Sequence, residues 1–97
     1  MKLPDFEIYE QGGQIRRSSK RVKDAIVEGY GRRRYKPDYI KFLTYSIAYC
    51  DETKSHVLSI KAIYPNLAEF SELEDEYDKL GRMINNYLQY VEKNWNS

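Results

Sequence analysis

The residues best suited to recognition chemistry are the basic side chains between Gln14 and Lys36. This stretch contains nine Lys or Arg and two acidic residues, so it carries +7 on a chain whose net charge is +1. Clusters of lysine and arginine neutralise phosphates and release counterions, which supplies the sequence-independent part of nucleic-acid binding. Tyrosines among such charges can stack on unpaired bases. The stretch therefore predicts a nucleic-acid-binding surface, and RNA or a nucleic-acid-associated protein is the preferred partner.

The predicted binding residues form one group along a helix and a second group in the loop that follows it. They are Arg16, Arg17, Lys20, Arg21, Arg32, Arg33, Arg34, Tyr35 and Lys36. Tyr30 and Tyr39 lie beside the second group and are further candidates for base stacking. A sequence pI near 7.8 means that any such binding must be local, because nucleic-acid-binding domains usually have a pI above about 9.

Two other interpretations of the same cations stay open. They can form a solvated helix face that ends in charges favoured by the helix dipole. They can also form a head-to-tail contact between copies, since residues 1–48 carry +5 and residues 49–97 carry −4. Heterologous contacts of that kind close into rings when the rotation allows it. The sequence therefore leaves a purely structural, self-assembling module, or a truncated remnant with no nucleic-acid partner, as the alternative function.

Other residue types that could do chemistry form no recognisable site. His56 has no Cys or His at metal-ligand spacing, and Cys50 falls on an apolar helix face, where we expect a small buried side chain. The Glu-x-x-His motif of di-iron bundles is missing. Gly29-x-Gly31 follows a helix rather than a strand, which is the wrong context for a phosphate loop. We therefore predict no catalytic residue, no metal and no cofactor, and expect a protein that is not an enzyme.

Composition predicts one soluble helical domain over residues 1–97. Charged residues make up 32% of the chain and hydrophobic ones 41%, with only five Gly and three Pro. The single cysteine excludes an internal disulfide, and no apolar run approaches the ~20 residues that span a bilayer. We expect a cytoplasmic protein with no membrane partner.

Apolar spacing predicts three helices, at about residues 9–30, 37–64 and 72–94. Pro4 and the Gly12-Gly13 pair predict a loose lead-in, because two glycines cost about 2 kcal/mol relative to alanine within a helix. Gly31 is expected to end the first helix in the left-handed conformation. Ser71 and Glu74 read as a capping box at the start of the third. These segments predict an all-α antiparallel bundle, with three long helices of an up-down four-helix pattern.

The second helix carries the clearest packing signal. Its apolar and small residues alternate at spacings of four and three, which is the seam of a helix packed lengthwise in a bundle. They are Tyr39, Leu43, Ser46, Cys50, Thr53, Val57, Ile60 and Tyr64. The third helix has a similar seam, formed by Leu73, Tyr77, Leu80, Ile84, Tyr87, Val91 and Trp95. Pro37 and Pro65 bracket the second helix.

Several segments resemble the four-helix-bundle family of 23S rRNA-intervening-sequence proteins. The matching segments are QIRRS at 14–18, IVEGYGRR at 26–33, Phe42-Leu43, Glu52-Thr53 and LGRMI at 80–84. The resemblance covers roughly residues 3 to 93. It implies an up-down bundle and ring-like homo-oligomers, pentamers in particular. It brings no catalytic residue to any position of this chain.

The chain departs from this family at its start. Members usually have a first helix of about 25 residues before the segment equivalent to Leu3-Pro4, whereas Met1 falls where that helix should end. The resemblance thus implies that three of the four helices are present. We expect an exposed apolar strip on the subunit, and self-association or a partner helix to cover it.

Overall fold

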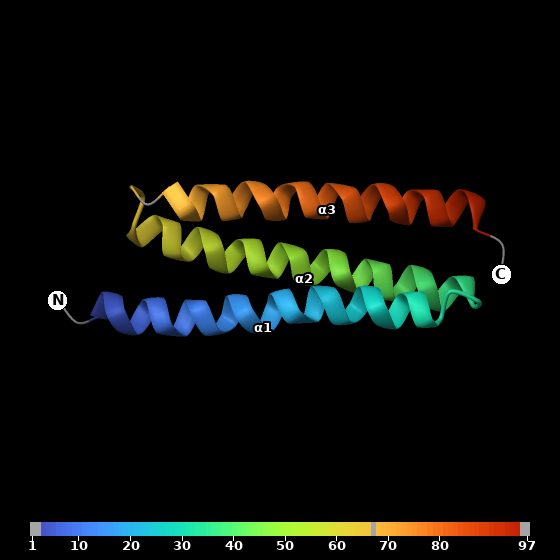
Figure 1. Ribbon diagram of the computed structural model, residues 1–97, viewed down its shortest axis with the longest axis horizontal. Coiled ribbons are helices and arrows are strands. Elements are labelled where there is room, and N and C mark those ends of the chain that lie inside the picture. The colour runs from blue at the N-terminus through green and yellow to red at the C-terminus, as the bar shows by residue number, and fades with distance from the viewer. Residues whose placement is uncertain (1–2, 67, 96–97) are drawn as a thin grey trace.

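The computed structural model contains three long helices joined by two short turns. It describes the backbone of residues 3–66 and 68–95, and the side chains of 10–66 and 68–95. The helices are α1 (Leu3–Gly31), α2 (Lys36–Ile63) and α3 (Ala68–Asn94). They run up, down and up, so that each is antiparallel to the next (Figure 1). Every regular element in these ranges is a helix, which confirms the predicted all-α antiparallel bundle.

The three helices lie side by side in a layer that is one helix thick. Helix α2 occupies the middle of the layer and packs against both α1 and α3 (Figure 1). Within the described residues, α1 and α3 do not pack directly against each other. The Cα atoms extend over 56 × 19 × 13 Å. In a four-helix bundle each helix would have two neighbours, so α1 and α3 each have one side without a helix partner here.

The core follows the seam predicted for α2. Seven of the eight seam residues are buried: Tyr39, Leu43, Ser46, Cys50, Thr53, Val57 and Ile60. Tyr64, the eighth, caps the helix and is half-buried. From α3, Ile84 and Val91 reach this core, while Tyr77, Leu80, Leu88 and Trp95 are partly buried against it. The strict alternation of four and three therefore identified the inward face of α2.

Small residues allow α1 and α2 to approach closely. Ser18 is fully buried and donates a hydrogen bond to the Gln14 carbonyl at 2.9 Å, while its Oγ lies 2.7 Å from Thr53 Oγ1. At Gly29 a Cβ atom would lie only 3.0 Å from Phe42 Cβ. The small side chains of Ser18 and Ala25 and the bare backbone of Gly29 thus let the two helices lie close together.

The first helix begins earlier than the sequence pattern predicts. It starts at Leu3 rather than near Tyr9, and it continues through Gly12 and Gly13. Packing explains the difference, because α2 extends alongside this segment and His56 Nδ1 lies 3.0 Å from Gln11 Oε1. The tertiary contacts with α2 outweigh the low helix propensity of two glycines.

The third helix also begins about one turn early, at Ala68 rather than Glu72. Ser71 therefore lies inside the helix, and the predicted capping box is wrong. Lys61 near the end of α2 pairs with Glu74 at 2.8 Å, which fixes the first turns of α3 against the last turn of α2. Helix α2 ends at Ile63, two residues before Pro65, because the residue that precedes a proline is disfavoured in the helical conformation.

Candidate nucleic-acid interface

A short turn of three consecutive arginines joins α1 to α2, and we call residues Arg32–Tyr35 the arginine turn. Hydrogen bonds run from the Arg32 amide to the Glu28 and Gly29 carbonyls at 3.2 and 3.0 Å, and from the Tyr35 amide to the Arg32 carbonyl at 2.9 Å. Gly31 is still helical, with no positive φ. The predicted left-handed C′ glycine is therefore wrong, because the chain leaves the helix through this tight hydrogen-bonded turn instead.

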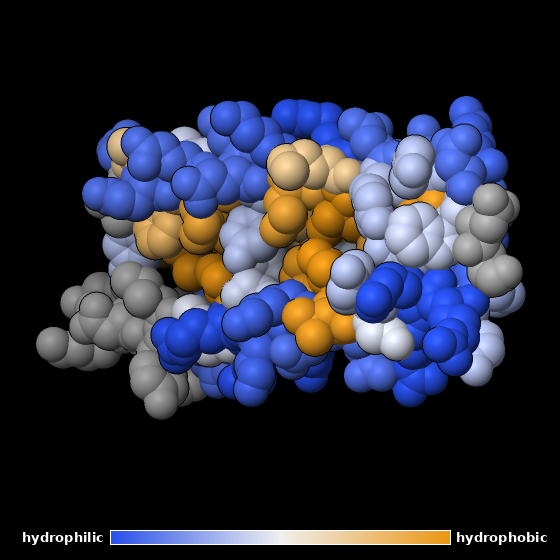
Figure 2. All heavy atoms as spheres, turned by 45° about the vertical axis from the view of Figure 1, so that its right-hand side comes forward, coloured by the Kyte–Doolittle hydropathy of each residue, from blue (hydrophilic) through white to orange (hydrophobic). Residues whose placement is uncertain are grey.

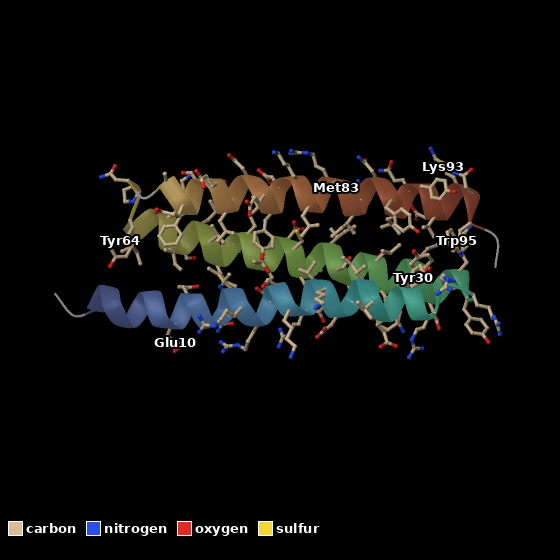
Figure 3. The ribbon with its side chains drawn as sticks, viewed as in Figure 1. Glu10, Tyr30, Tyr64, Met83, Lys93 and Trp95 are labelled. Carbon is tan, nitrogen blue, oxygen red and sulfur yellow. The ribbon has the colours of Figure 1, made fainter. Side chains whose placement is uncertain are left out.

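The end of α3 fixes the arginine turn in place. Trp95 Nε1 donates to the Arg33 carbonyl at 2.8 Å, and its ring meets the Tyr39 ring edge-on at 5.2 Å. Lys36 Nζ donates to the Glu92 carbonyl at 2.8 Å. Figure 3 shows Tyr30 and Trp95 at this same end of the bundle. The turn is thus held by all three helices, and its exposed cations project from a defined backbone.

The three arginines of the turn differ in how far their charges are neutralised. Arg32 Nε lies 2.8 Å from Glu28 Oε2 and its NH1 lies 3.6 Å from Asp38 Oδ2. The hydrogen bond to Glu28 raises the pKa of the Arg32 guanidinium, and both carboxylates neutralise its charge. Arg33 instead donates to the Tyr30 carbonyl at 2.8 Å and stacks on that tyrosine ring at 3.9 Å.

No carboxylate neutralises the charge of Arg33 or Arg34, because neither forms an ion pair within the part of the chain whose side chains are described. Both side chains are exposed. Among the described side chains, the structure thus leaves two of the three guanidinium groups of the turn available to an external anion. It leaves the ammonium group of Lys36 available as well, since that group donates to an uncharged carbonyl.

The second predicted group lies in the middle of α1. Arg16, Arg17 and Lys20 are exposed and share one side of the helix, and none is in an ion pair with another residue of 10–95 that the structure describes. Arg21 NH1 lies 3.9 Å from Glu52 Oε1, a loose surface pair. Positions 17 and 32 are separated by about 22 Å along the axis of α1. The structure therefore does not bring the two groups of basic residues together. They lie at separate places along one edge of the layer.

The three tyrosines that are candidates for base stacking differ in how far their rings are exposed. Tyr30 and Tyr35 are 55% and 60% exposed, and the Arg33 guanidinium covers one face of the Tyr30 ring. Tyr39 is buried, its hydroxyl lies 2.7 Å from that of Tyr87, and burial raises the pKa of its phenol above the usual range. The expectation that Tyr39 stacks on a base is therefore wrong, because it belongs to the core beneath the turn.

Cys50 and His56 take the places expected of structural residues. The Cys50 thiol is buried, and burial raises its pKa, which disfavours the reactive thiolate. His56 Nε2 lies 3.9 Å from Glu52 Oε1, and His56 Nδ1 lies 3.0 Å from Gln11 Oε1. Across the described side chains there is no cluster of three or more metal-ligating residues. None of the helices in this part of the chain is long and apolar enough to cross a membrane.

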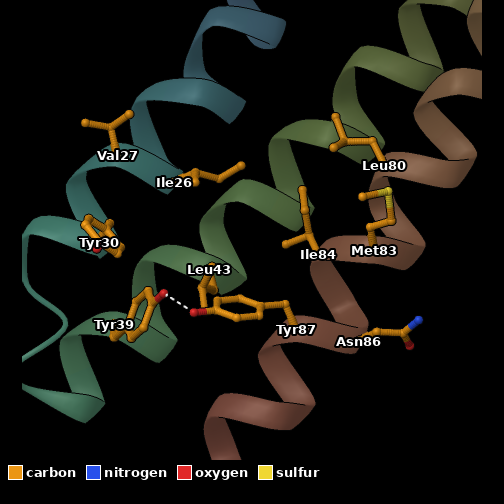
Figure 4. Close-up of a pocket in the computed structure, with 10 residues that line it drawn as sticks. All are labelled: Ile26, Val27, Tyr30, Tyr39, Leu43, Leu80, Met83, Ile84, Asn86 and Tyr87. Carbon is orange, nitrogen blue, oxygen red and sulfur yellow. Dashed lines mark hydrogen bonds between the residues drawn. The ribbon is translucent and has the colours of Figure 1, made fainter. Parts of the chain in front are cut away.

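The sequence pattern did not locate a long concave feature of the surface, which we call the apolar groove. It runs between α1 and α3 above the seam of α2 and has a volume of about 780 Å³ (Figure 4). Its lining comprises Ile26, Val27, Tyr30, Tyr39, Leu43, Leu80, Met83, Ile84, Asn86 and Tyr87. Figure 2 shows the hydrophobic side chains gathered along the middle of this face, with hydrophilic ones above and below. The sequence predicted an exposed apolar strip. It could not predict which residues line the strip, because that depends on the angles at which the helices pack.

Comparison with known proteins finds a family that matches most of the chain. Residues 1–86 match the family described as 23S rRNA-intervening sequence protein. No curated protein and no solved structure matches the chain. The match takes in α1, α2 and most of α3, including the arginine turn and both sides of the groove. Three antiparallel amphipathic helices and a family match over most of the chain thus agree, and the protein belongs to the 23S rRNA-intervening sequence protein family.

Proposed function

We propose that this chain is a non-enzymatic RNA-binding protein that works as an assembly of identical subunits. The RNA contact is centred on the arginine turn and extends along α1 to Arg16, Arg17 and Lys20. The family name associates its members with intervening sequences of 23S rRNA, which favours RNA over DNA as the partner. Cytoplasmic location is part of the same proposal.

One observation carries the proposal: the ion pairs of the described chain leave the charges of Arg33 and Arg34 unneutralised, on a turn whose backbone accepts a hydrogen bond from Trp95. Guanidinium groups bind phosphate oxygens through two parallel hydrogen bonds, and a fixed backbone reduces the entropy lost on binding. The exposed rings of Tyr30 and Tyr35 flank these charges, and they offer unpaired bases the Tyr35 ring and the face of the Tyr30 ring that Arg33 does not cover. Together they make a compact phosphate-and-base contact surface.

The experiment is a binding titration of a fluorescent RNA hairpin at 50 mM salt. We expect the double variant Arg33→Glu/Arg34→Glu to bind at least about 100-fold more weakly, since each lost charge-assisted contact is worth roughly 1.5–3 kcal/mol. The matched control is Lys79→Glu/Arg82→Glu, which makes the same charge change at exposed positions of α3. Equal losses in both variants would mean that net charge, rather than the turn, governs binding.

A second candidate function is self-assembly without nucleic acid. The apolar groove favours it, because contiguous exposed apolar surface of this kind marks interaction sites. If the hairpin does not bind at 50 mM salt while the protein still forms oligomers, the structural role replaces the RNA-binding role.

A further inference from the structure

Two groups of aromatic rings reach the surface away from the arginine turn, and they differ in their surroundings. The first lies between α1 and α2, where Phe42, Tyr45 and Tyr49 line a shallow depression. Cations of the chain already lie over two of these rings, with Arg32 5.2 Å from the centre of Phe42 and Arg21 5.9 Å from that of Tyr49. Two carboxylates of α1 line the same depression and would repel a phosphate. This first group therefore does not suit RNA.

The second group lies on α3, at the end of the bundle that holds the arginine turn. Tyr87 and Tyr90 are 38% and 51% exposed, and their rings stack with centroids 6.0 Å apart and planes 24° apart. The Tyr87 hydroxyl lies 2.7 Å from that of the buried Tyr39, which ties the pair to the core. Among the described side chains no cation lies over the Tyr90 ring. The face of Tyr90 that points away from Tyr87 is thus open to a ligand.

Basic side chains lie close to this pair of rings. Trp95 Nε1 donates to the Arg33 carbonyl, so the arginine turn meets α3 five residues, or about 7.5 Å along the axis, beyond Tyr90. Lys93 follows Tyr90 by three residues, which places the two side chains on the same side of α3. Lys93 is exposed, and it forms no ion pair with the residues whose side chains are described. Figure 3 shows Lys93 and Trp95 at the same end of the bundle.

The charge of this end of the bundle favours an anion. Residues 28–38 and 87–95 contain five basic and three acidic residues, which leaves a net charge of +2. Two of the three carboxylates pair with Arg32, and the third belongs to the exposed Glu92. The basic residues without a carboxylate partner among the described side chains are Arg33, Arg34, Lys36 and Lys93. An open aromatic face beside several available cations is the combination that binds single-stranded nucleic acid.

We propose that Tyr87, Tyr90 and Lys93 form a binding site for an unpaired RNA nucleotide beside the arginine turn. The base stacks on the Tyr90 ring, and the flanking phosphates contact Lys93 and the arginine turn. The inference rests on the proposed function and names the class of RNA that is bound, a single-stranded segment, because a base inside a duplex has no free face for a side chain. All three residues lie beyond residues 1–86, so the family match does not account for them.

The first test compares two fluorescent RNAs at 50 mM salt, a single strand of about eight nucleotides and a long duplex in which nearly all bases are paired. Tyr90→Ala should weaken binding of the single strand at least about fivefold and leave binding of the duplex unchanged, because only an unpaired base can stack on the lost ring. Tyr90→Phe keeps the ring and should bind both RNAs as the wild type does. The matched control is Tyr45→Ala, which removes an exposed ring of the first group and should change neither affinity.

The second test measures the salt dependence of single-strand binding. Lys93→Ala should make the slope of log K against log salt less steep by about 0.7, the value for one phosphate contact on a single strand. Lys79→Ala removes another exposed lysine of α3 and should leave the slope unchanged. Equal slopes in Lys93→Ala and the wild type would overturn the phosphate contact of Lys93.

The outcomes separate this site from the proposed function. If Tyr90→Ala binds the single strand as the wild type does, or weakens the duplex by the same factor, the stacking site is overturned while RNA binding by the arginine turn stands. An equal loss in Tyr45→Ala would overturn the site as well. If the wild type binds neither RNA, the proposed function fails and the stacking site fails with it.

Discussion

Replacing Gly29 with alanine probes the closest approach between α1 and α2, directly before the arginine turn. In an open helical position glycine-to-alanine stabilises by about 0.5–1 kcal/mol. At Gly29 the new methyl group would lie 3.0 Å from Phe42 Cβ and 3.4 Å from a ring carbon of Tyr39. Phe42 Cβ is bonded directly to the α2 backbone, so it cannot swing away as the end of a flexible side chain can. One of the helices must shift.

Overpacking of this kind costs about 1–3 kcal/mol, which exceeds the gain in helix propensity. We therefore expect Gly29→Ala to lower the free energy of unfolding by about 1 kcal/mol. Gly12→Ala is the matched control, since its methyl group would meet only the flexible end of Arg16 at 3.6 Å. It should raise the free energy of unfolding by about 0.5–1 kcal/mol.

The assay is urea denaturation followed by circular dichroism, at one protein concentration for all variants because association adds to the apparent stability. Unchanged m-values would show that only stability has changed. The two variants should differ by roughly 2 kcal/mol. If Gly29→Ala stabilises as much as Gly12→Ala, the close crossing beside Phe42 is not real, and the placement of the arginine turn fails with it.

Two further predictions concern buried groups of the core. The Cys50 thiol should react with a disulfide reagent at pH 8 at least about 100-fold more slowly in the folded than in the urea-unfolded protein, because the thiol is buried and its pKa is raised. Equal reaction rates in the two states would contradict the packed seam of α2. The Tyr39 pKa is raised above its unfolded value of about 10, so its contribution to stability is present below pH 10 and is lost as the pH rises above it. The free energy of unfolding should therefore fall between pH 10 and 11.5, and by less in Tyr39→Phe; identical falls would show that Tyr39 ionises normally in the folded state.

The sequence predicted those parts of the fold that depend on periodicity. The seam of α2 from Tyr39 to Ile60 could be identified residue by residue, because a repeat of four and three fixes which side of a helix faces its neighbours. The starts of α1 and α3 were placed too late. Local signals such as Gly12-Gly13 and Ser71 were outweighed by contacts with α2 that are distant in sequence, including His56 with Gln11 and Lys61 with Glu74.

The candidate site was only partly accessible to sequence reasoning. The arginine cluster was evident from composition, but nothing local indicated that Arg32 pairs with Glu28 and Asp38 while Arg33 does not. The support from Trp95 was missed because it lies 62 residues away from Arg33. A signal did exist: antiparallel topology places the end of α3 beside the end of α1. Tyr39 looked like a binding residue by its neighbours, and only its position on the seam indicated burial.

The central claim is that the arginine turn binds RNA phosphates, and the salt dependence of RNA affinity tests it most directly. Arg33, Arg34 and Lys36 would each neutralise one phosphate, which predicts a slope of at least about −2.7 for log K against log salt on a helical RNA. Removing two of them in Arg33→Ala/Arg34→Ala should make the slope less steep by at least about 1.8. No binding at 50 mM salt, or the same slope in the variant and the wild type, would contradict the claim.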